Sequence, residues 1–209
     1  MHRTAFIATL LLAGAANANL IVNGGFEDMP NWNNGIGGDG AYTLFVGNSI
    51  PGWTIASGRG ATIHNTNVYP TISGTYSLNT DGEGFNGHNV DIYQDFASAN
   101  GQAYALTFDW KNWFSDGVVR LDVSIVDQVS NNVLAQGNYG LDPGNHNETL
   151  SFAGSGNTLR LRVTCNPESG YNDNTFIVDN FAVEAIPAPG AVAALSIGSV
   201  FAMRRRRHA

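Results

Sequence analysis

Apolar and polar residues alternate along most of the chain between residues 19 and 185, and this pattern is the strongest restriction on the fold. Tyr104, Leu106, Phe108 and Trp110 are one example, and the segment Val119–Ile125 is another. Successive side chains of a β-strand point to opposite faces, so each segment is predicted to be a strand with one buried face. Helical periodicity is nearly absent between the two ends. The sequence therefore predicts an all-β fold.

Further strands are predicted at 20–23, 43–46, 53–56, 90–96, 148–152, 158–165 and 175–185. Turn-rich stretches such as Asn33-Asn34-Gly35 and Asp142-Pro143-Gly144-Asn145 separate them. About ten short strands joined by such turns favour a β-sandwich, and within that class a jelly roll. The alternation places Trp53, Trp110 and Cys165 inside the sandwich.

The N-terminus has the pattern of a secretory signal peptide. Residues Ala5 to Ala16 are apolar and follow a weakly basic start, and Ala16-Asn17-Ala18 is a small-x-small cleavage site. We therefore predict that residues 1–18 are a signal helix removed after Ala18, and that residues 19–185 are the exported domain.

Residues 186–209 form a second terminal signal. The predicted hydrophobic helix 190–203 has 14 residues, fewer than the roughly 20 that span a bilayer unaided. The basic cluster at 204–207 is expected to stay cytoplasmic, which places the preceding domain outside. The tail resembles the PEP-CTERM sorting signal, on the residues Pro187, Ala188, Pro189, Gly190, Arg204, Arg205, Arg206 and Arg207.

This resemblance implies export machinery and an exosortase-type membrane protease as partners, with the tail acting as sorting signal and transient membrane anchor. Ala188 departs from the usual pattern, which has glutamate there. A short tail anchor that is never processed is the alternative. In both cases the expected location is the cell envelope, the cell surface or the extracellular matrix.

Charge restricts the ligands. Of ten basic residues, five remain once Arg3 and the tail arginines are set aside, against seventeen acids, so the exported domain carries a net charge of −12. Such a surface repels phosphate backbones, which excludes nucleic acid as the expected partner. It is compatible with neutral glycans and with cations.

Several segments occur in an order that resembles the galactose-binding-like jelly rolls, which include carbohydrate-binding modules. They are 19–27, 50–54, 77–79, 93–96, 104–108 and 177–183. The resemblance implies a non-catalytic domain that binds glycan or exopolysaccharide matrix. It also implies a structural Ca²⁺ between the first and last strands, held by Glu27 and Asp179 with backbone oxygens. The alternative is that Glu27 caps a loop and Asp179 bonds to a neighbouring turn.

Sugar binding in such domains uses exposed aromatic rings flanked by polar groups. The candidates outside the core pattern are Trp32, Trp113, Phe114 and Tyr171.

Catalytic signatures are missing from the sequence. It has no Gly-x-Ser-x-Gly elbow and no histidine or cysteine spacing typical of zinc sites. We therefore expect no enzymatic activity. Two alternatives stay open: a structural surface or matrix protein with protein partners and no sugar binding, and an exported hydrolase with an unrecognised site.

Overall fold

The computed structural model describes residues 18–30, 42–57, 60–66, 70–80, 90–114, 119–140, 142–167 and 175–187. Residues 19–186 form one compact unit. Apart from Ala18 and Pro187, the predicted signal peptide and the sorting motif lie outside the described residues. Within the described ranges, no helix has both the length and the hydropathy needed to cross a membrane.

The described residues contain eleven strands and no helix. They are β1 (Tyr42–Phe45), β2 (Thr54–Ile55), β3 (Ala61–Asn65), β4 (Tyr76–Asn79), β5 (Asp91–Ala97), β6 (Ala103–Phe114), β7 (Val119–Asp127), β8 (Val133–Tyr139), β9 (Gly144–Ala153), β10 (Thr158–Pro167) and β11 (Thr175–Ala185).

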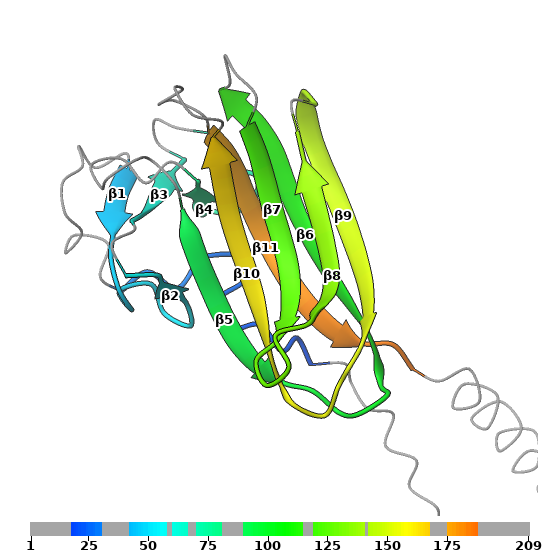
Figure 1. Ribbon diagram of the computed structural model, residues 1–209. Coiled ribbons are helices and arrows are strands. Elements are labelled where there is room, and N and C mark those ends of the chain that lie inside the picture. Colours follow the sequence, from blue (N-terminus) through cyan, green and yellow to red (C-terminus); the bar gives the residue numbers. More distant parts are fainter. Residues whose placement is uncertain are drawn as a thin grey trace, which may run out of the picture. The chain divides into compact units, whose positions relative to one another are not determined.

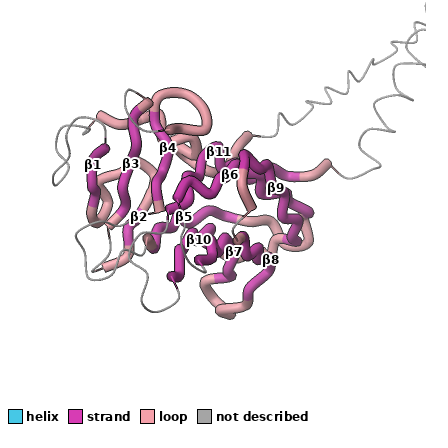
Figure 2. Tube along the Cα trace, turned by 90° about the horizontal axis from the view of Figure 1, so that it is seen from above, coloured by secondary structure: helices cyan, strands magenta, loops and turns pink. Residues whose placement is uncertain are grey.

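The strands form two antiparallel sheets that pack face to face (Figure 1). The six-stranded sheet has the order β1-β3-β4-β11-β6-β9, and the five-stranded sheet has the order β2-β5-β10-β7-β8. Figure 2, seen from above, shows the two sheets as separate layers. The all-β prediction is confirmed, and the architecture is a two-sheet β-sandwich.

The core lies between the sheets, where the alternating residues meet. Tyr104, Leu106, Phe108 and Trp110 of β6 are all buried, as are Leu121, Val123 and Ile125 of β7. Each fully buried large side chain contributes about 1.5–3 kcal/mol. The predicted core positions Trp53, Trp110 and Cys165 are confirmed.

One predicted strand is wrong. Residues 20–23 form turns, with Asn23 and Phe26 in the left-handed region at φ 52° and 55°. The side-chain Oδ1 of Asn19 accepts hydrogen bonds from the backbone N–H groups of Ile21 and Val183. Such side-chain bonds to the backbone replace the regular strand ladder here.

Three strands, β3, β4 and β8, were not predicted. All five residues of β3 are buried, and its alternation of apolar Ala61 and Ile63 with polar Thr62 and His64 is only five residues long. β8 lies at a sheet edge and is half-exposed or exposed throughout, so it shows no apolar face.

The N-terminal segment lies against an irregular part of β11. Leu20 N donates to Val183 O over 2.9 Å, and Phe181 N donates to Gly24 O over 3.0 Å. β11 shifts register between Asp179 and Ala182, and Asn180 has a φ of 56°. These contacts bring the two ends of the folded unit together beside Asp179.

Candidate functional site

The outer face of the five-stranded sheet carries two arginine–aspartate pairs around one tyrosine. β5 supplies Asp91, Tyr93 and Asp95, and β10 supplies Arg160 and Arg162. Because neighbours two residues apart share a face, each strand presents its set on one side. The register places Arg160 opposite Asp95 and Arg162 opposite Tyr93. We call these five residues the arginine face.

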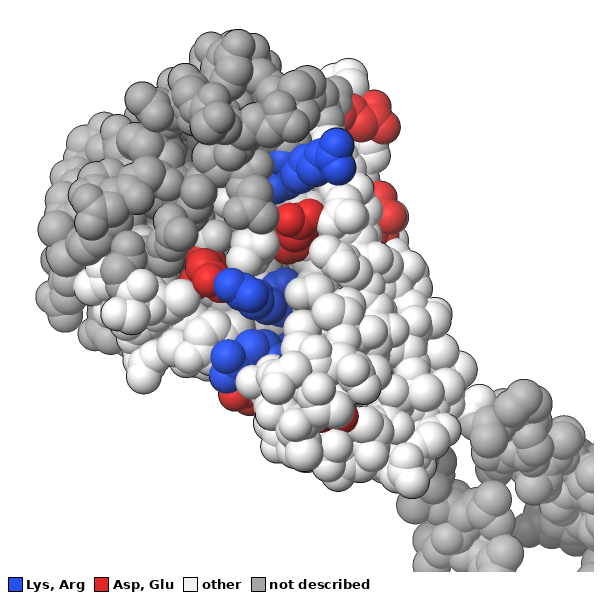
Figure 3. Space-filling model, viewed as in Figure 1, with Lys and Arg blue, Asp and Glu red and all other residues white. Residues whose placement is uncertain are grey.

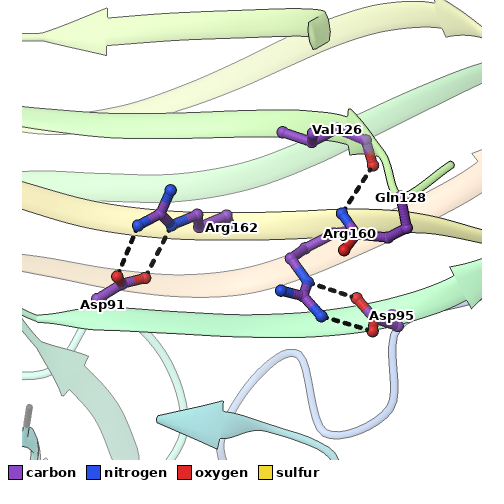
Figure 4. A network of polar contacts seen from close by, with 6 residues as sticks. All are labelled: Asp91, Asp95, Val126, Gln128, Arg160 and Arg162. Atoms are coloured by element: carbon purple, nitrogen blue, oxygen red, sulfur yellow. Dashed lines mark hydrogen bonds and ion pairs between the residues drawn. The ribbon is translucent and has the colours of Figure 1, made fainter. Parts of the chain in front are cut away.

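Both arginines bind their partners with two parallel hydrogen bonds (Figure 4). Arg160 Nε and Nη2 donate to the two carboxylate oxygens of Asp95 over 2.7 and 2.8 Å. Arg162 Nε and Nη2 donate to those of Asp91 over 2.9 and 2.7 Å. The guanidinium carbon of Arg160 also lies 3.6 Å from the centre of the Tyr93 ring. The planar groups are thus held in fixed orientations.

The arginine face has compensated charge and spare hydrogen-bonding capacity. The bonds to Asp95 and Asp91 raise the pKa of Arg160 and of Arg162, so both arginines stay charged. A guanidinium has five N–H donors, so each arginine retains donors beyond its two bonds to aspartate. The Arg162 side chain is 49% exposed. Figure 3 shows basic and acidic groups side by side on this face, next to a largely uncharged surface.

The sequence prediction missed the arginine face. Asp91-x-Tyr93-x-Asp95 and Arg160-x-Arg162 are visible as alternating polar positions. Only the pairing of β5 with β10 shows that these sets meet.

Asp179, one of the two predicted calcium ligands, is fully buried and hydrogen-bonded at both oxygens. Its Oδ2 accepts bonds from Ser73 N, Ser73 Oγ and Ser77 Oγ over 3.1, 3.2 and 2.8 Å. Its Oδ1 accepts a bond from Asn180 N over 2.8 Å. Burial nevertheless raises the pKa of Asp179 to about 6, because the charged form loses its hydration.

Glu27, the other predicted ligand, holds the same turn as Asp179. Its Oε1 accepts bonds from Thr75 N and Tyr76 N over 2.8 and 3.0 Å. A Cβ on Gly74 would lie 2.1 Å from this oxygen, so the turn approaches Glu27 closely. These hydrogen bonds are the ones expected if Glu27 caps a loop.

The two carboxylates, one of them buried, are ligands that calcium prefers, but the groups of the turn that contact them are N–H and hydroxyl donors. Among the described residues, no three acidic, histidine or cysteine side chains are grouped as a metal site would require. Calcium would thus need backbone carbonyls to complete its shell.

Of the four predicted sugar-binding rings, the structure places one side chain. Trp113, on the outer face of the six-stranded sheet, is 40% exposed and meets His64 edge to face at 5.1 Å between ring centres. Trp32, Tyr171 and the side chain of Phe114 lie outside the described residues. Trp113 therefore lies on the opposite sheet from the arginine face.

The sequence matches no protein-family model and no curated protein. Among solved structures, the chain is similar to an arabinose-bound α-L-arabinofuranosidase, at 12% identity and a TM-score of 0.53. That match covers 81% of this chain but only 26% of the enzyme, so the chain spans about a quarter of its length.

Two carbohydrate-binding modules also match and are covered almost completely. A family 61 module in complex with β-1,4-galactotriose is 14% identical, covers 81% of this chain and 99% of its own, and has a TM-score of 0.47. A family 4 module is 12% identical, with coverages of 79% and 99% and a TM-score of 0.43. At these identities the likeness concerns the β-sandwich fold alone.

Proposed function

We propose that residues 19–186 form a non-catalytic module that binds a neutral polysaccharide on the arginine face. The observation that carries this proposal is the fixed, charge-compensated set of donors and acceptors around Tyr93. Planar polar side chains in fixed positions are suited to the hydroxyl groups of a sugar, and they cost little entropy on binding. The net charge of −12 favours a neutral chain over a polyanion.

The test is retention on neutral polysaccharides in affinity electrophoresis. Arg160→Met and Arg162→Met should each weaken retention about tenfold, because each removes a charged donor. Trp113→Ala, on the opposite sheet, is the matched control and should leave retention on neutral glycans unchanged. If the unmodified chain were retained by no neutral polysaccharide, the proposal would be wrong and the alternative of a structural protein with protein partners would be favoured.

The same proposal includes export to the cell envelope as a jelly-roll cargo domain. The signal-peptide pattern ending at Ala18 and the Pro187–Gly190 motif with its arginine cluster support it. An exosortase-type protease would release the domain from its transient anchor. The mass of the mature protein from the envelope fraction tests this step: loss of both ends is expected, and an intact tail would mean a permanent anchor.

Calcium is part of the proposal as a structural ion. Glu27 and Asp179 would hold it, and the positive charge would compensate the buried carboxylate of Asp179. The ion would stabilise the junction between the N-terminal segment and β11.

A further inference from the structure

Lys111 is a half-buried cation that has no ion-pair partner among the described residues, in a unit with a net charge of −12. Its Nζ donates to Thr71 O over 3.4 Å, which is a long bond. The ion pairs within the described residues involve His146, Arg160 and Arg162. Burial lowers the pKa of Lys111, because the ammonium is partly removed from water there. An anion bound here would offset that loss of hydration.

Lys111 lies on the outer face of the six-stranded sheet, together with Trp113 two residues further along β6. Trp113 contacts His64 of β3, although β4 and β11 lie between β3 and β6. Asn79 and Ile177, on the two intervening strands, are buried. Lys111 and the exposed indole of Trp113 therefore lie beside each other on β6.

Two acidic groups of this face, Asp109 and Asp179, already have other partners. Asp109 accepts hydrogen bonds from Asn147 Nδ2 and Asn180 Nδ2, both over 2.7 Å. Asp179 is fully buried and accepts bonds from Ser73, Ser77 and Asn180. Neither carboxylate is paired with Lys111 in the ion pairs of the described residues. His64 is held neutral because burial lowers its pKa to about 4.

We propose that Lys111 and Trp113 form a second glycan site, which binds a uronic acid residue. The ammonium of Lys111 binds the sugar carboxylate, and the indole of Trp113 packs against the sugar ring. This site differs from the arginine face in sheet, in residues and in the charge of its ligand. It goes beyond the proposed neutral-glycan function and does not depend on it.

The test is affinity electrophoresis of the full chain in polygalacturonate and, as matched ligand, in the same polymer with its carboxylates methyl-esterified. We expect retention by the acid form at about 0.15 M salt and about tenfold weaker binding to the ester, because the ester lacks the charge. Lys111→Met should weaken binding to the acid form about tenfold, and Lys111→Arg should restore most of it.

Two further variants separate this site from the arginine face and from loss of folding. Arg160→Met should leave polygalacturonate binding unchanged, and Trp113→Ala should weaken it. Thermal unfolding of each variant identifies any that fail to fold, and Lys111→Arg keeps the test decisive if Lys111→Met does not fold. Equal binding of acid and ester, no retention of the native chain, or unchanged binding by Lys111→Met would each overturn the proposal.

Discussion

Asp179 combines full burial with four hydrogen bonds, and burial still raises its pKa to about 6. The unfolded chain has the ordinary aspartate pKa of about 3.9. Between about pH 4 and pH 6 the folded state therefore binds a proton that the unfolded state has lost. The contribution of Asp179 to stability falls as pH rises through this window, by about 1–3 kcal/mol. Urea unfolding of Asp179→Asn with EDTA should lack this decline.

His64 should have the opposite effect on the pH dependence of stability. Burial lowers its pKa to about 4, whereas the unfolded histidine titrates near 6.5. The unfolded state therefore takes up a proton first as pH falls, and the contribution of His64 is lost between about pH 6.5 and pH 4. The native chain should combine both trends, whereas His64→Gln should become more stable as pH falls from 6 to 4. A His64→Gln variant that loses stability in this range would contradict the assignment.

Bound calcium would reverse the direction of the pKa shift of Asp179, because a bound cation favours the charged carboxylate. If Glu27 and Asp179 bind Ca²⁺, millimolar Ca²⁺ at pH 7 must raise the melting temperature, since only the native state has the site. Asp179→Asn should lose this response. Glu184→Gln, which changes an exposed carboxylate on the same strand, should keep it. A melting temperature that does not change with Ca²⁺ in the native chain would leave only the loop-capping role.

At the scale of elements, the junction between the N-terminal segment and β11 leaves no room for a side chain at Gly24. A Cβ there would lie 1.9 Å from the carbonyl oxygen of Phe181, a backbone atom of β11. Gly24→Ala should therefore lower the free energy of unfolding by about 2–4 kcal/mol. Gly140→Ala is the control, because a Cβ there meets nothing within 4 Å, and it should change stability by less than about 0.5 kcal/mol. Chemical denaturation of the two variants measures the difference.

The elements with one buried face could be predicted from the sequence, and those without one could not. Thr175–Ala185 was predicted with the bounds of β11, and β6 and β7 were found from their alternating residues. β8 escaped because neither of its faces is buried, and β3 because its alternation is only five residues long. Residues 20–23 were misassigned because their backbone bonds to a nearby side chain. Alternation arises when one face of a strand is exposed to solvent and the other is buried, so it cannot detect strands that lack this contrast.

The prediction of the candidate sites has a similar limit, because the sequence does not show which strands pair with each other. Glu27 and Asp179 were identified as neighbours from the sequence, and the structure brings both against the turn at Ser73–Tyr76. The arginine face was missed, because it depends on which strand pairs with β5 and in which register. Lys111 was missed as well, since its lack of an ion-pair partner among the described residues shows only in three dimensions.

At the scale of the whole molecule, the two proposed sites lie on the outer faces of opposite sheets, so one folded unit can contact two glycan chains at once. A neutral chain on the arginine face and a uronate chain at Lys111 should therefore bind independently. Saturating the protein with a neutral polysaccharide that it binds should not reduce the binding of the protein to polygalacturonate. Competition between the two polymers would indicate a single shared site.

The net charge of the folded unit gives the last prediction. A charge of −12 repels a polyanion at long range, whereas the contact with Lys111 acts at a few ångströms. Raising the ionic strength from about 0.01 M to 0.15 M shortens the Debye length from about 30 Å to 8 Å, so it screens the repulsion more than the contact. Binding to polygalacturonate should therefore strengthen over this range, the opposite of a basic glycan-binding protein. Lys111→Met should remain weak throughout, and binding that weakens steadily with salt would show that attraction between net charges dominates instead.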